Sequence, residues 1–259
     1  MTGPILRVEG LVRSYQGVRA VDGLSLQVAR GGITGLIGPN GSGKSTTIDL
    51  LTGFQRAEAG RWWLDGMPLS GKGPHAIARA GLVRTFQTVR AFEAMSVLDN
   101  LRQAASSAGR LGLAQRYLGT AASRRAEANA TARAEEMLAL TGLTPHRDSP
   151  AERLSYGQHK LLALAAGMMS GPRLLVLDEP VAGVNPTMVR LVADVLRQVN
   201  ARGVTLLLVE HNMDFVMRLC SHVVVLDAGR LLVEGEPAAV QQHPMVLEAY
   251  LGGTGAAHG

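Results

Sequence analysis

The sequence predicts an α/β protein, and three observations lead to that class. Short apolar runs at residues 33–37, 174–177 and 204–209 are typical of strands in a sheet that is covered on both faces. Helical patterns lie between these runs, as in a mostly parallel sheet. A glycine-rich stretch follows the first run, and acidic residues or a histidine follow the other two. Residues that bind or react with a ligand are therefore predicted where these strands end.

The composition indicates a globular protein with a sizeable core. The 259 residues are 46% apolar and 18% charged, which argues against a disordered chain. The longest apolar runs, such as 161–166, are far shorter than the ~18 residues that a membrane-spanning helix needs. Charged residues within 1–12 argue against a signal peptide, so we expect the protein to stay on the cytosolic side of the membrane.

The single cysteine, Cys220, excludes an intrachain disulfide and fits a reducing compartment. It ends a helical pattern at 213–220. We expect it to be a small, buried apolar side chain in preference to a reactive thiol.

The net charge of +5 permits an anionic partner, such as nucleic acid, a lipid surface or a nucleotide. The arginines between residues 102 and 133 are spread out and interspersed with glutamates. This pattern favours a solvated helical face over a nucleic-acid site, and a face near anionic lipid headgroups is the alternative. We therefore expect no nucleic-acid partner.

The glycine-rich stretch fits the phosphate-binding pattern G-x-x-x-x-G-K-[ST], and it lies between strand 33–37 and helix 44–51, as that motif requires. Glycines let the backbone come close to a ligand, and successive N–H groups then converge on phosphate oxygens. Lys44 is expected to reach the β- and γ-phosphates, and the Ser45 hydroxyl to ligate Mg²⁺. A chance match is expected in roughly one chain of this length in a hundred. The predicted nucleotide-binding residues are Gly38, Pro39, Asn40, Gly41, Ser42, Gly43, Lys44, Ser45 and Thr46.

Two adjacent carboxylates follow strand 174–177, at the end where ligands bind in an open parallel sheet. Asp178 is placed to hold Mg²⁺, directly or through water, and Glu179 to polarise a water that attacks the γ-phosphate. His211 ends strand 204–209 and is a candidate for contacting the same phosphate. The alternatives are solvated acids in a turn and a structural histidine.

The pattern S-x-x-Q formed by Ser155 and Gln158 predicts a capping box at the start of a helix over 154–170. This capping alone explains why a helix begins here, without any ligand. The alternative is that the capped helix N-terminus also binds an anion. Tyr15 is expected in the turn between the first two strands. It is either a surface tyrosine or a platform for a base, and no local feature decides between them.

The remaining segments follow from periodicity and turn residues. A helical insertion, rich in Ala, Arg and Glu, is expected between two strands of the sheet. The expected elements are strands at 5–13 and 18–28, a hairpin of 61–64 with 67–69, a helix at 74–81, a strand at 82–86, helices from 96 to 143 with loops near Gly109, Gly112 and Gly119, a helix at 185–202, a hairpin of 222–226 with 231–234, and two short C-terminal helices.

Taken together, these residues resemble the ATP-binding subunit of ABC transporters over nearly the whole chain. The phosphate loop, Gln87, the signature 154–158, the strand 174–179 and His211 occur in that family's order and spacing. The resemblance implies that the nucleotide is ATP, that Tyr15 stacks on adenine, and that Gln87 couples Mg²⁺ to a membrane partner.

The same resemblance assigns the remaining site residues. It implies that the signature contacts the ATP held by a second ATPase subunit, and that 182–185 crosses the dimer interface. The implied roles are Glu179 and His211 for catalysis; Ser45, Gln87 and Asp178 for Mg²⁺; and Ser155, Tyr156, Gly157 and Gln158 for the partner's ATP.

The resemblance also specifies the architecture, a P-loop NTPase core of ABC ATPase type with an N-terminal antiparallel β subdomain and an inserted α-helical subdomain. We expect one domain over 1–252. Its parts are the core with the β subdomain at 1–95 and 171–235, the helical subdomain with the signature at 96–170, and the C-terminal helices at 236–252; the tail 253–259 is expected to be disordered.

A closer likeness lies in the stretches VRTFQTVRAFEAMSVLDNL, LSYGQ, DEPVAGVNP and VEHNMDFVM. These are similar to the ATPase subunits of branched-chain amino acid importers, a group that includes urea and amide importers. This implies a peripheral protein at the cytoplasmic face of the membrane, which hydrolyses ATP to power uptake. Its implied partners are a second ATPase subunit, identical or related, two transmembrane permease subunits and, indirectly, an extracytoplasmic substrate-binding protein.

The chain departs from the wider family in its signature helix. Tyr156 stands where most ABC proteins have glycine, although the importer subgroup often has tyrosine. Arginines usually follow Gln158, and here the residues are His159, Lys160 and then apolar ones. The rival functions are the ATPase of a lipopolysaccharide or lipid exporter, a soluble ABC ATPase that acts on nucleic acid or ribosomes, and a nucleotide-binding regulator.

Overall fold

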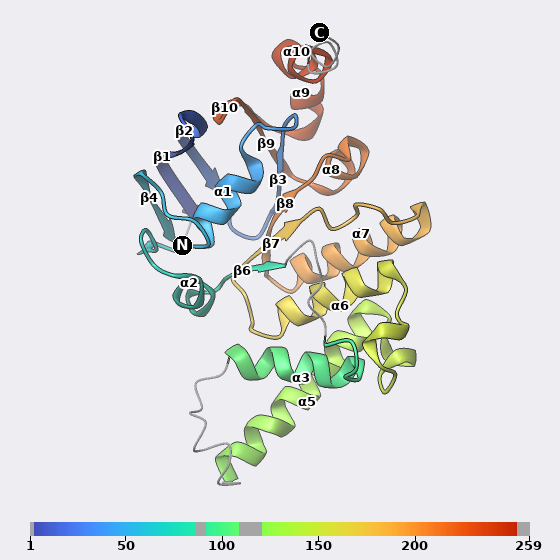
Figure 1. Cartoon of the computed structure of the whole chain (residues 1–259). Coiled ribbons are helices and arrows are strands. Elements are labelled where there is room, and N and C mark those ends of the chain that lie inside the picture. Colours follow the sequence, from blue (N-terminus) through green and yellow to red (C-terminus); the bar gives the residue numbers. More distant parts are fainter. Residues whose placement is uncertain (1–2, 86–91, 109–120, 253–259) are drawn as a thin grey trace. The chain divides into compact units, whose positions relative to one another are not determined.

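The computed structural model describes residues 3–85, 92–108 and 121–252 (Figure 1). The chain divides into two compact units, which are described separately. The first unit comprises Met1–Arg84, Arg173–Ala182 and Val199–Gly259, and the second comprises Thr85–Pro172 and Gly183–Gln198.

A six-stranded sheet forms the centre of the first unit, with the strand order β10-β9-β3-β8-β7-β6. Strand β3 pairs in parallel with β8 and β9, β7 pairs in parallel with β8, and β10 is antiparallel to β9. Every residue of β3, β7 and β8 is buried, which confirms the prediction from their apolar runs. The strands are β3 (Ile33–Ile37), β6 (Leu82–Thr85), β7 (Leu174–Asp178), β8 (Thr205–Val209), β9 (His222–Asp227) and β10 (Arg230–Gly235).

The register of this sheet brings three strand ends to one edge. Val209 lies opposite Leu36 of β3 on one side and Asp178 of β7 on the other. The chain therefore leaves all three strands at nearly the same level. The loops that follow begin at Gly38, Glu179 and Glu210.

Five helices of the first unit lie around this sheet among the described residues. They are α1 (Lys44–Leu51), α2 (Pro74–Ala80), α8 (Met213–Leu219), α9 (Pro237–Gln241) and α10 (Pro244–Gly252). Ile48 and Leu51 of α1 are fully buried in one apolar cluster with Leu36 and Val176. This packing fixes the helix that follows the phosphate loop against the sheet.

A second, antiparallel sheet of the order β2-β1-β4-β5 confirms the predicted β subdomain. Its strands are β1 (Leu6–Tyr15), β2 (Val18–Val28), β4 (Ala59–Leu64) and β5 (Met67–Pro68). Residues at the start of β1 alternate between buried and exposed, because one face packs on the core. Tyr15, predicted in the turn, is the last residue of β1, since the strand pairing continues to Tyr15 opposite Val18.

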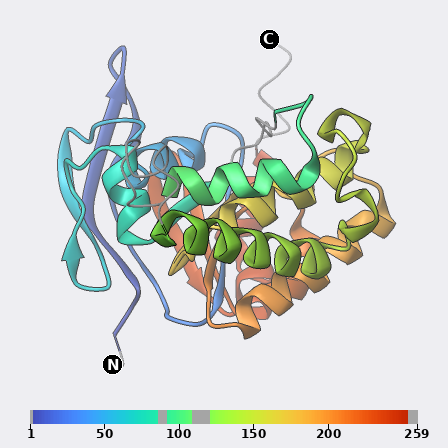
Figure 2. The ribbon, with the colours of Figure 1, turned by 90° about the horizontal axis from the view of Figure 1, so that it is seen from below.

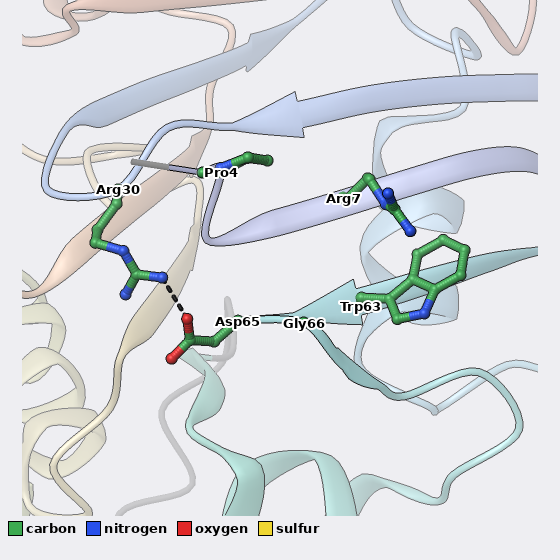
Figure 3. Close-up of a pocket in the computed structure, with 7 residues that line it drawn as sticks. Pro4, Arg7, Arg30, Trp63, Asp65 and Gly66 are labelled. Carbon is green, nitrogen blue, oxygen red and sulfur yellow. Dashed lines mark hydrogen bonds and ion pairs between the residues drawn. The ribbon is translucent and has the colours of Figure 1, made fainter. Parts of the chain in front are cut away.

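A hollow of about 400 Å³ lies at the start of β1 (Figure 3). The Arg7 guanidinium stacks on the ring of Trp63, 4.2 Å from its centroid, and Asp65 pairs with Arg30 and with Arg173. These arginines already have partners, and the predicted site residues do not line the hollow. It is lined by Gly3, Pro4, Arg7, Arg30, Trp63, Asp65 and Gly66.

The second unit is helical. Helices α3 and α5 run side by side, and α6 packs against both (Figure 2). Its elements are α3 (Val97–Ala108), α5 (Ala121–Thr141), the 3₁₀ turns η1 (Thr144–His146) and η2 (Ala151–Arg153), α6 (Tyr156–Met168) and most of α7 (Pro186–Ala201). The loops predicted near Gly109, Gly112 and Gly119 lie outside the described residues, as does the tail predicted at 253–259.

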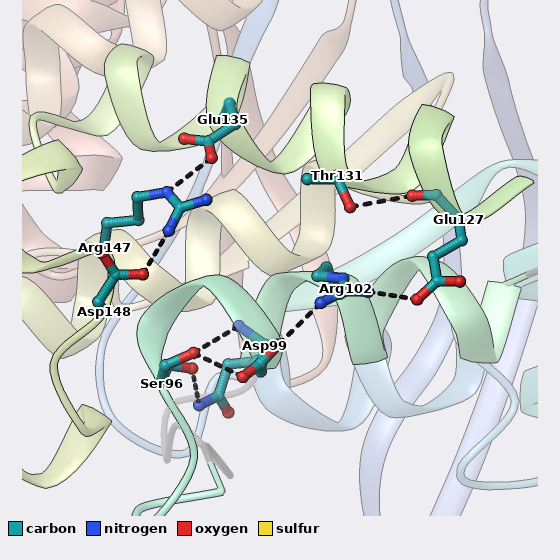
Figure 4. Close-up of polar contacts among 9 residues, drawn as sticks. Ser96, Asp99, Arg102, Glu127, Thr131, Glu135, Arg147 and Asp148 are labelled. Atoms are coloured by element: carbon teal, nitrogen blue, oxygen red, sulfur yellow. Dashed lines mark hydrogen bonds and ion pairs between the residues drawn. The ribbon is translucent and has the colours of Figure 1, made fainter. Parts of the chain in front are cut away.

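Acidic side chains neutralise two arginines on the outer surface of this helical unit (Figure 4). Arg102 pairs with Asp99 at 3.2 Å and with Glu127 at 2.5 Å, and it joins α3 to α5. Arg147 pairs with Glu135 at 2.7 Å and also with Asp148. At these positions the structure agrees with the predicted solvated face. Among the described helices, none is long and apolar enough to cross a membrane.

Cys220 lies at the end of α8 with 8% of its surface exposed, and burial raises its pKa to about 12. Because the thiolate is the reactive form, the raised pKa leaves almost none of it at pH 8. We expect an aromatic disulfide reagent to label the native protein at pH 8 far more slowly than a free thiol. Labelling in 6 M guanidinium is expected to be complete, and equally fast labelling in both conditions would contradict this.

Candidate functional site

The phosphate loop joins β3 to α1, as predicted. The structure places Gly38, Pro39, Asn40, Gly41, Ser42 and Gly43 in the loop and Lys44, Ser45 and Thr46 in the first turn of α1.

Two glycines of the loop fit positions that other residues cannot take. The φ angles of Gly38 and Gly43 are 149° and 95°, in the region that L side chains rarely adopt. A Cβ atom at Gly38 would lie 2.1 Å from the carbonyl oxygen of Leu226, and one at Gly43 would lie 2.2 Å from that of Ala20. The loop is therefore a close-packed backbone cradle, and its shape requires glycine at both ends.

The N-terminus of α1 fits an anion. Within the described residues, no side chain caps it, and its first turn contains no acidic residue. The first N–H groups of a helix have no acceptor inside the helix, and the helix dipole places partial positive charge there. A phosphate group satisfies both conditions.

The Lys44 amine lies across this loop. Its Nζ donates to the carbonyl oxygens of Gly38 at 2.8 Å and Pro39 at 2.9 Å. Burial lowers the pKa of Lys44, and the charges of Glu179 and Asp178 oppose that shift. The ammonium thus lies against the loop backbone, within reach of the charges of the two acids, and can donate to a phosphate bound in the loop.

Asp178 ends β7 with 8% of its surface exposed, and Arg84 of β6 holds it. The two Nη atoms of Arg84 donate separately, one to Asp178 Oδ2 at 2.7 Å and the other to Asp49 Oδ1 of α1 at 2.5 Å. The guanidinium therefore ties the acid at the end of β7 to the helix that follows the phosphate loop.

The donor set fits Mg²⁺ rather than a metal held by the protein alone. The described residues contain no group of three or more His, Cys, Asp or Glu side chains that could hold a metal ion. Mg²⁺ is usually bound by one or two carboxylates, water and substrate phosphates. Asp178 and the Ser45 hydroxyl carry oxygen donors of that kind, whereas Gln87, the third predicted ligand, lies outside the described residues.

Glu179 has a strained backbone. Its φ is 48°, in the left-handed region that costs a non-glycine residue of order 1 kcal/mol or more. Its N–H donates to the carbonyl oxygen of Val209 at 2.9 Å, and its Oε1 lies 3.8 Å from Nδ1 of His211. The structure therefore brings together the two predicted catalytic side chains from the ends of β7 and β8.

Tyr15 has 39% of its surface exposed, so the ring is open to a ligand. The guanidinium of Arg13 lies 4.9 Å from the ring centroid. This exposure is compatible with stacking on a base, which stays a prediction.

The signature residues lie at the start of α6 in the second unit. Ser155 is the N-cap: its N–H donates to Gln158 Oε1 at 2.8 Å, and its Oγ accepts from the Gln158 N–H at 3.4 Å, which confirms the predicted capping box. Tyr156 is 56% exposed, and Lys160 lies 5.5 Å over its ring. Gly157 is tightly packed, because a Cβ atom there would lie 2.7 Å from Cγ of Met188.

Sequence reasoning missed two charged residues beside the predicted site, Arg84 and Glu210. Arg84 lies within a strand that the sequence predicted, and its side chain is 11% exposed; Glu210 stands next to His211. Glu210 is only 1% exposed. A charged residue inside or directly after an apolar strand was the available signal, because such a residue is seldom buried without a partner.

The first unit therefore combines a phosphate loop between β3 and α1 with acids at the end of β7, a parallel strand that β8 separates from β3 in the same sheet. This arrangement defines a P-loop nucleotide-hydrolysing protein.

Comparisons with known proteins identify the family. The family model described as ABC transporter matches residues 21–182. The high-affinity branched-chain amino acid transport ATP-binding protein BraF of Pseudomonas aeruginosa is 40% identical over 97% of this chain and 99% of its own length. The corresponding protein LivG of Escherichia coli is 38% identical over the same shares of both chains. A crystal structure of an ATP-binding cassette of an ABC transporter in its ADP conformation matches with a TM-score of 0.85 and 33% identity, covering 97% of this chain and 100% of the other. The chain belongs to the ABC transporter family and is one of its ATPases.

Replacing Arg84 by Met should destabilise the protein by about 3 kcal/mol, because it leaves Asp178 and Asp49 without their shared cation. Urea unfolding measures the loss. Arg197→Met is the matched control, since its pair with Asp194 is exposed and is expected to contribute less than about 1 kcal/mol. Equal losses in the two variants would contradict the role given to Arg84.

Proposed function

We propose that this chain is the ATP-binding and ATP-hydrolysing subunit of an importer of branched-chain amino acids or related small amides. The observation that carries the proposal is the meeting of the phosphate loop, Glu179 and His211 at one edge of the sheet. This edge belongs to a chain that is 40% identical, over nearly its whole length, to a branched-chain amino acid transport ATP-binding protein.

The phosphate loop binds the phosphates of ATP through its backbone N–H groups and the N-terminus of α1. The Lys44 amine exchanges its two carbonyl acceptors in the loop for oxygens of the β- and γ-phosphates. Tyr15 supplies a ring for the adenine. The residues that contact ATP are Tyr15, Gly38, Pro39, Asn40, Gly41, Ser42, Gly43, Lys44, Ser45 and Thr46.

Ser45, Gln87 and Asp178 would hold Mg²⁺, which would supply positive charge to neutralise the β- and γ-phosphates. Arg84 holds one carboxylate oxygen of Asp178 and so orients that side chain. Glu179 polarises the attacking water, and His211 contacts the γ-phosphate from the neighbouring loop.

A second ATPase subunit, identical or related, completes the site. Each subunit presents the start of its α6 to the ATP held by the other, through Ser155, Tyr156, Gly157 and Gln158. Because ATP makes these contacts only in the closed pair, its binding favours closure and its hydrolysis removes that preference.

The working assembly contains two transmembrane permease subunits and depends on an extracytoplasmic substrate-binding protein. The pair of ATPase subunits binds the permeases as a peripheral protein at the cytoplasmic face of the membrane. The chain acts as one domain over 1–252, with the helical subdomain at 96–170 inserted between the core segments 1–95 and 171–235 and followed by the helices of 236–252.

Glu179→Gln removes the carboxylate that polarises water and keeps the volume of the side chain. ATP hydrolysis is expected to fall by about 100-fold or more, while nucleotide binding is retained. Phosphate release measures the first effect and a fluorescent ATP analogue the second. Near-normal turnover would contradict the catalytic role of Glu179.

The transport function is tested by uptake of labelled leucine in cells whose only copy carries Lys44→Ala. Uptake is expected to be lost, because the phosphates lose their lysine. Lys72→Ala, at an exposed lysine outside the site, is the matched control and should transport normally. Normal uptake in the Lys44 variant, in cells without a second leucine transporter, would contradict branched-chain amino acids as the substrate. It would favour transport of urea, other amides or an exported lipid.

A further inference from the structure

Glu210 is a buried carboxylate and the first residue of the loop that follows β8. It is 1% exposed and stands between Val209, the last residue of β8, and His211. Burial raises its pKa, whereas hydrogen bonds from backbone N–H groups lower it. A carboxylate in such a position needs donors around it, and the structure supplies three from the main chain.

These donors come from two different loops. Oε1 accepts from the N–H of Val181, in the loop after β7, at 3.0 Å. Oε2 accepts from the N–H groups of His211 at 3.2 Å and Asn212 at 3.3 Å, in its own loop. One side chain therefore joins the loop that carries Glu179 to the loop that carries His211.

The bond to Val181 acts next to a strained residue. The left-handed backbone of Glu179 persists only if its surroundings hold it. The Glu179 N–H donates to the Val209 carbonyl oxygen, and two residues later the Val181 N–H donates to Glu210. Hydrogen bonds to Val209 and Glu210, at the end of β8, thus hold the chain at Glu179 and again two residues later.

We propose that Glu210 is a positioning residue for ATP hydrolysis. Its carboxylate ties the Val181 amide to the backbone of His211 and Asn212, and so keeps Glu179 and His211 facing each other. This inference rests on the catalytic roles proposed above for Glu179 and His211. Glu210 itself touches neither water nor phosphate in this scheme.

A carboxylate suits this position better than any neutral side chain of its size. All three partners are donors, and an ionised carboxylate is an acceptor only. A glutamine has one acceptor oxygen, so its amide NH₂ would face at least one backbone N–H. A glutamine at position 210 therefore fills the same space but cannot satisfy both loops, which isolates the hydrogen bonds from the packing.

The test uses the full-length chain with Glu210→Gln and Glu210→Ala. The control is Glu236→Gln, at an exposed glutamate whose side chain makes no cap hydrogen bond to α9. Steady-state hydrolysis gives kcat and KM for ATP, and hydrogen–deuterium exchange reports the peptides that contain 179–183 and 38–46. We expect kcat to fall about 10- to 100-fold in Glu210→Gln, with KM within about twofold of the unchanged protein. Exchange should rise in 179–183 and stay unchanged in 38–46, and the control should match the unchanged protein.

Three results would overturn the proposal. The first is a normal kcat in a folded Glu210→Gln protein. The second is an equal loss of exchange protection in 38–46, and the third is failure of both Glu210 variants to fold, because either would assign Glu210 to general stability. Glu179→Gln, assayed in parallel, separates the two levels of the argument. If it is inactive while Glu210→Gln is normal, only the positioning role fails, whereas an active Glu179→Gln protein would overturn both.

Discussion

The site depends on the backbone ladder that joins β3, β8 and β7. Because Val209 is paired with Leu36 on one side and with Asp178 on the other, the three strands end together. A slip of this register by one residue would turn each side chain to the opposite face of the sheet and would separate the acids from the phosphate loop. Complete burial of all three strands makes such a slip costly. The apolar strands therefore secure the geometry of the polar loops.

The N-termini of α1 and α6 differ in how their free backbone N–H groups are satisfied. The start of α1 has no side-chain cap among the described residues, whereas Ser155 and Gln158 cap α6 from within the chain. The first end therefore leaves backbone N–H groups available to a ligand, and the second is satisfied by its own side chains. Such a division suits a protein in which one end binds its own nucleotide and the other meets a nucleotide that a partner brings.

The sequence was sufficient to predict the parts of the site that depend on residue type and local spacing. The phosphate loop, the acids at the end of β7 and the capping box of Ser155 follow from residue type and spacing, whereas the antiparallel β subdomain followed from the resemblance to ABC ATPases. Arg84 and Glu210 could not be assigned in this way, because their partners are set by strand order. Only the placement of β6 beside β7 brings Arg84 to Asp178, and only the pairing of β7 with β8 brings Glu210 to Val181. The turn predicted between the first two strands is present at Gln16 and Gly17, but pairing with Val18 makes Tyr15 the last residue of β1. The role of Gln87 and the domain boundaries stay predictions.

The left-handed backbone at Glu179 places activity and stability in opposition. Glycine and asparagine adopt this conformation with less strain than glutamate, so either would relax the loop. Selection for heat resistance alone would therefore favour replacement of the residue to which we assign catalysis. A glutamate in this conformation therefore costs the fold some stability in exchange for a carboxylate at the end of β7.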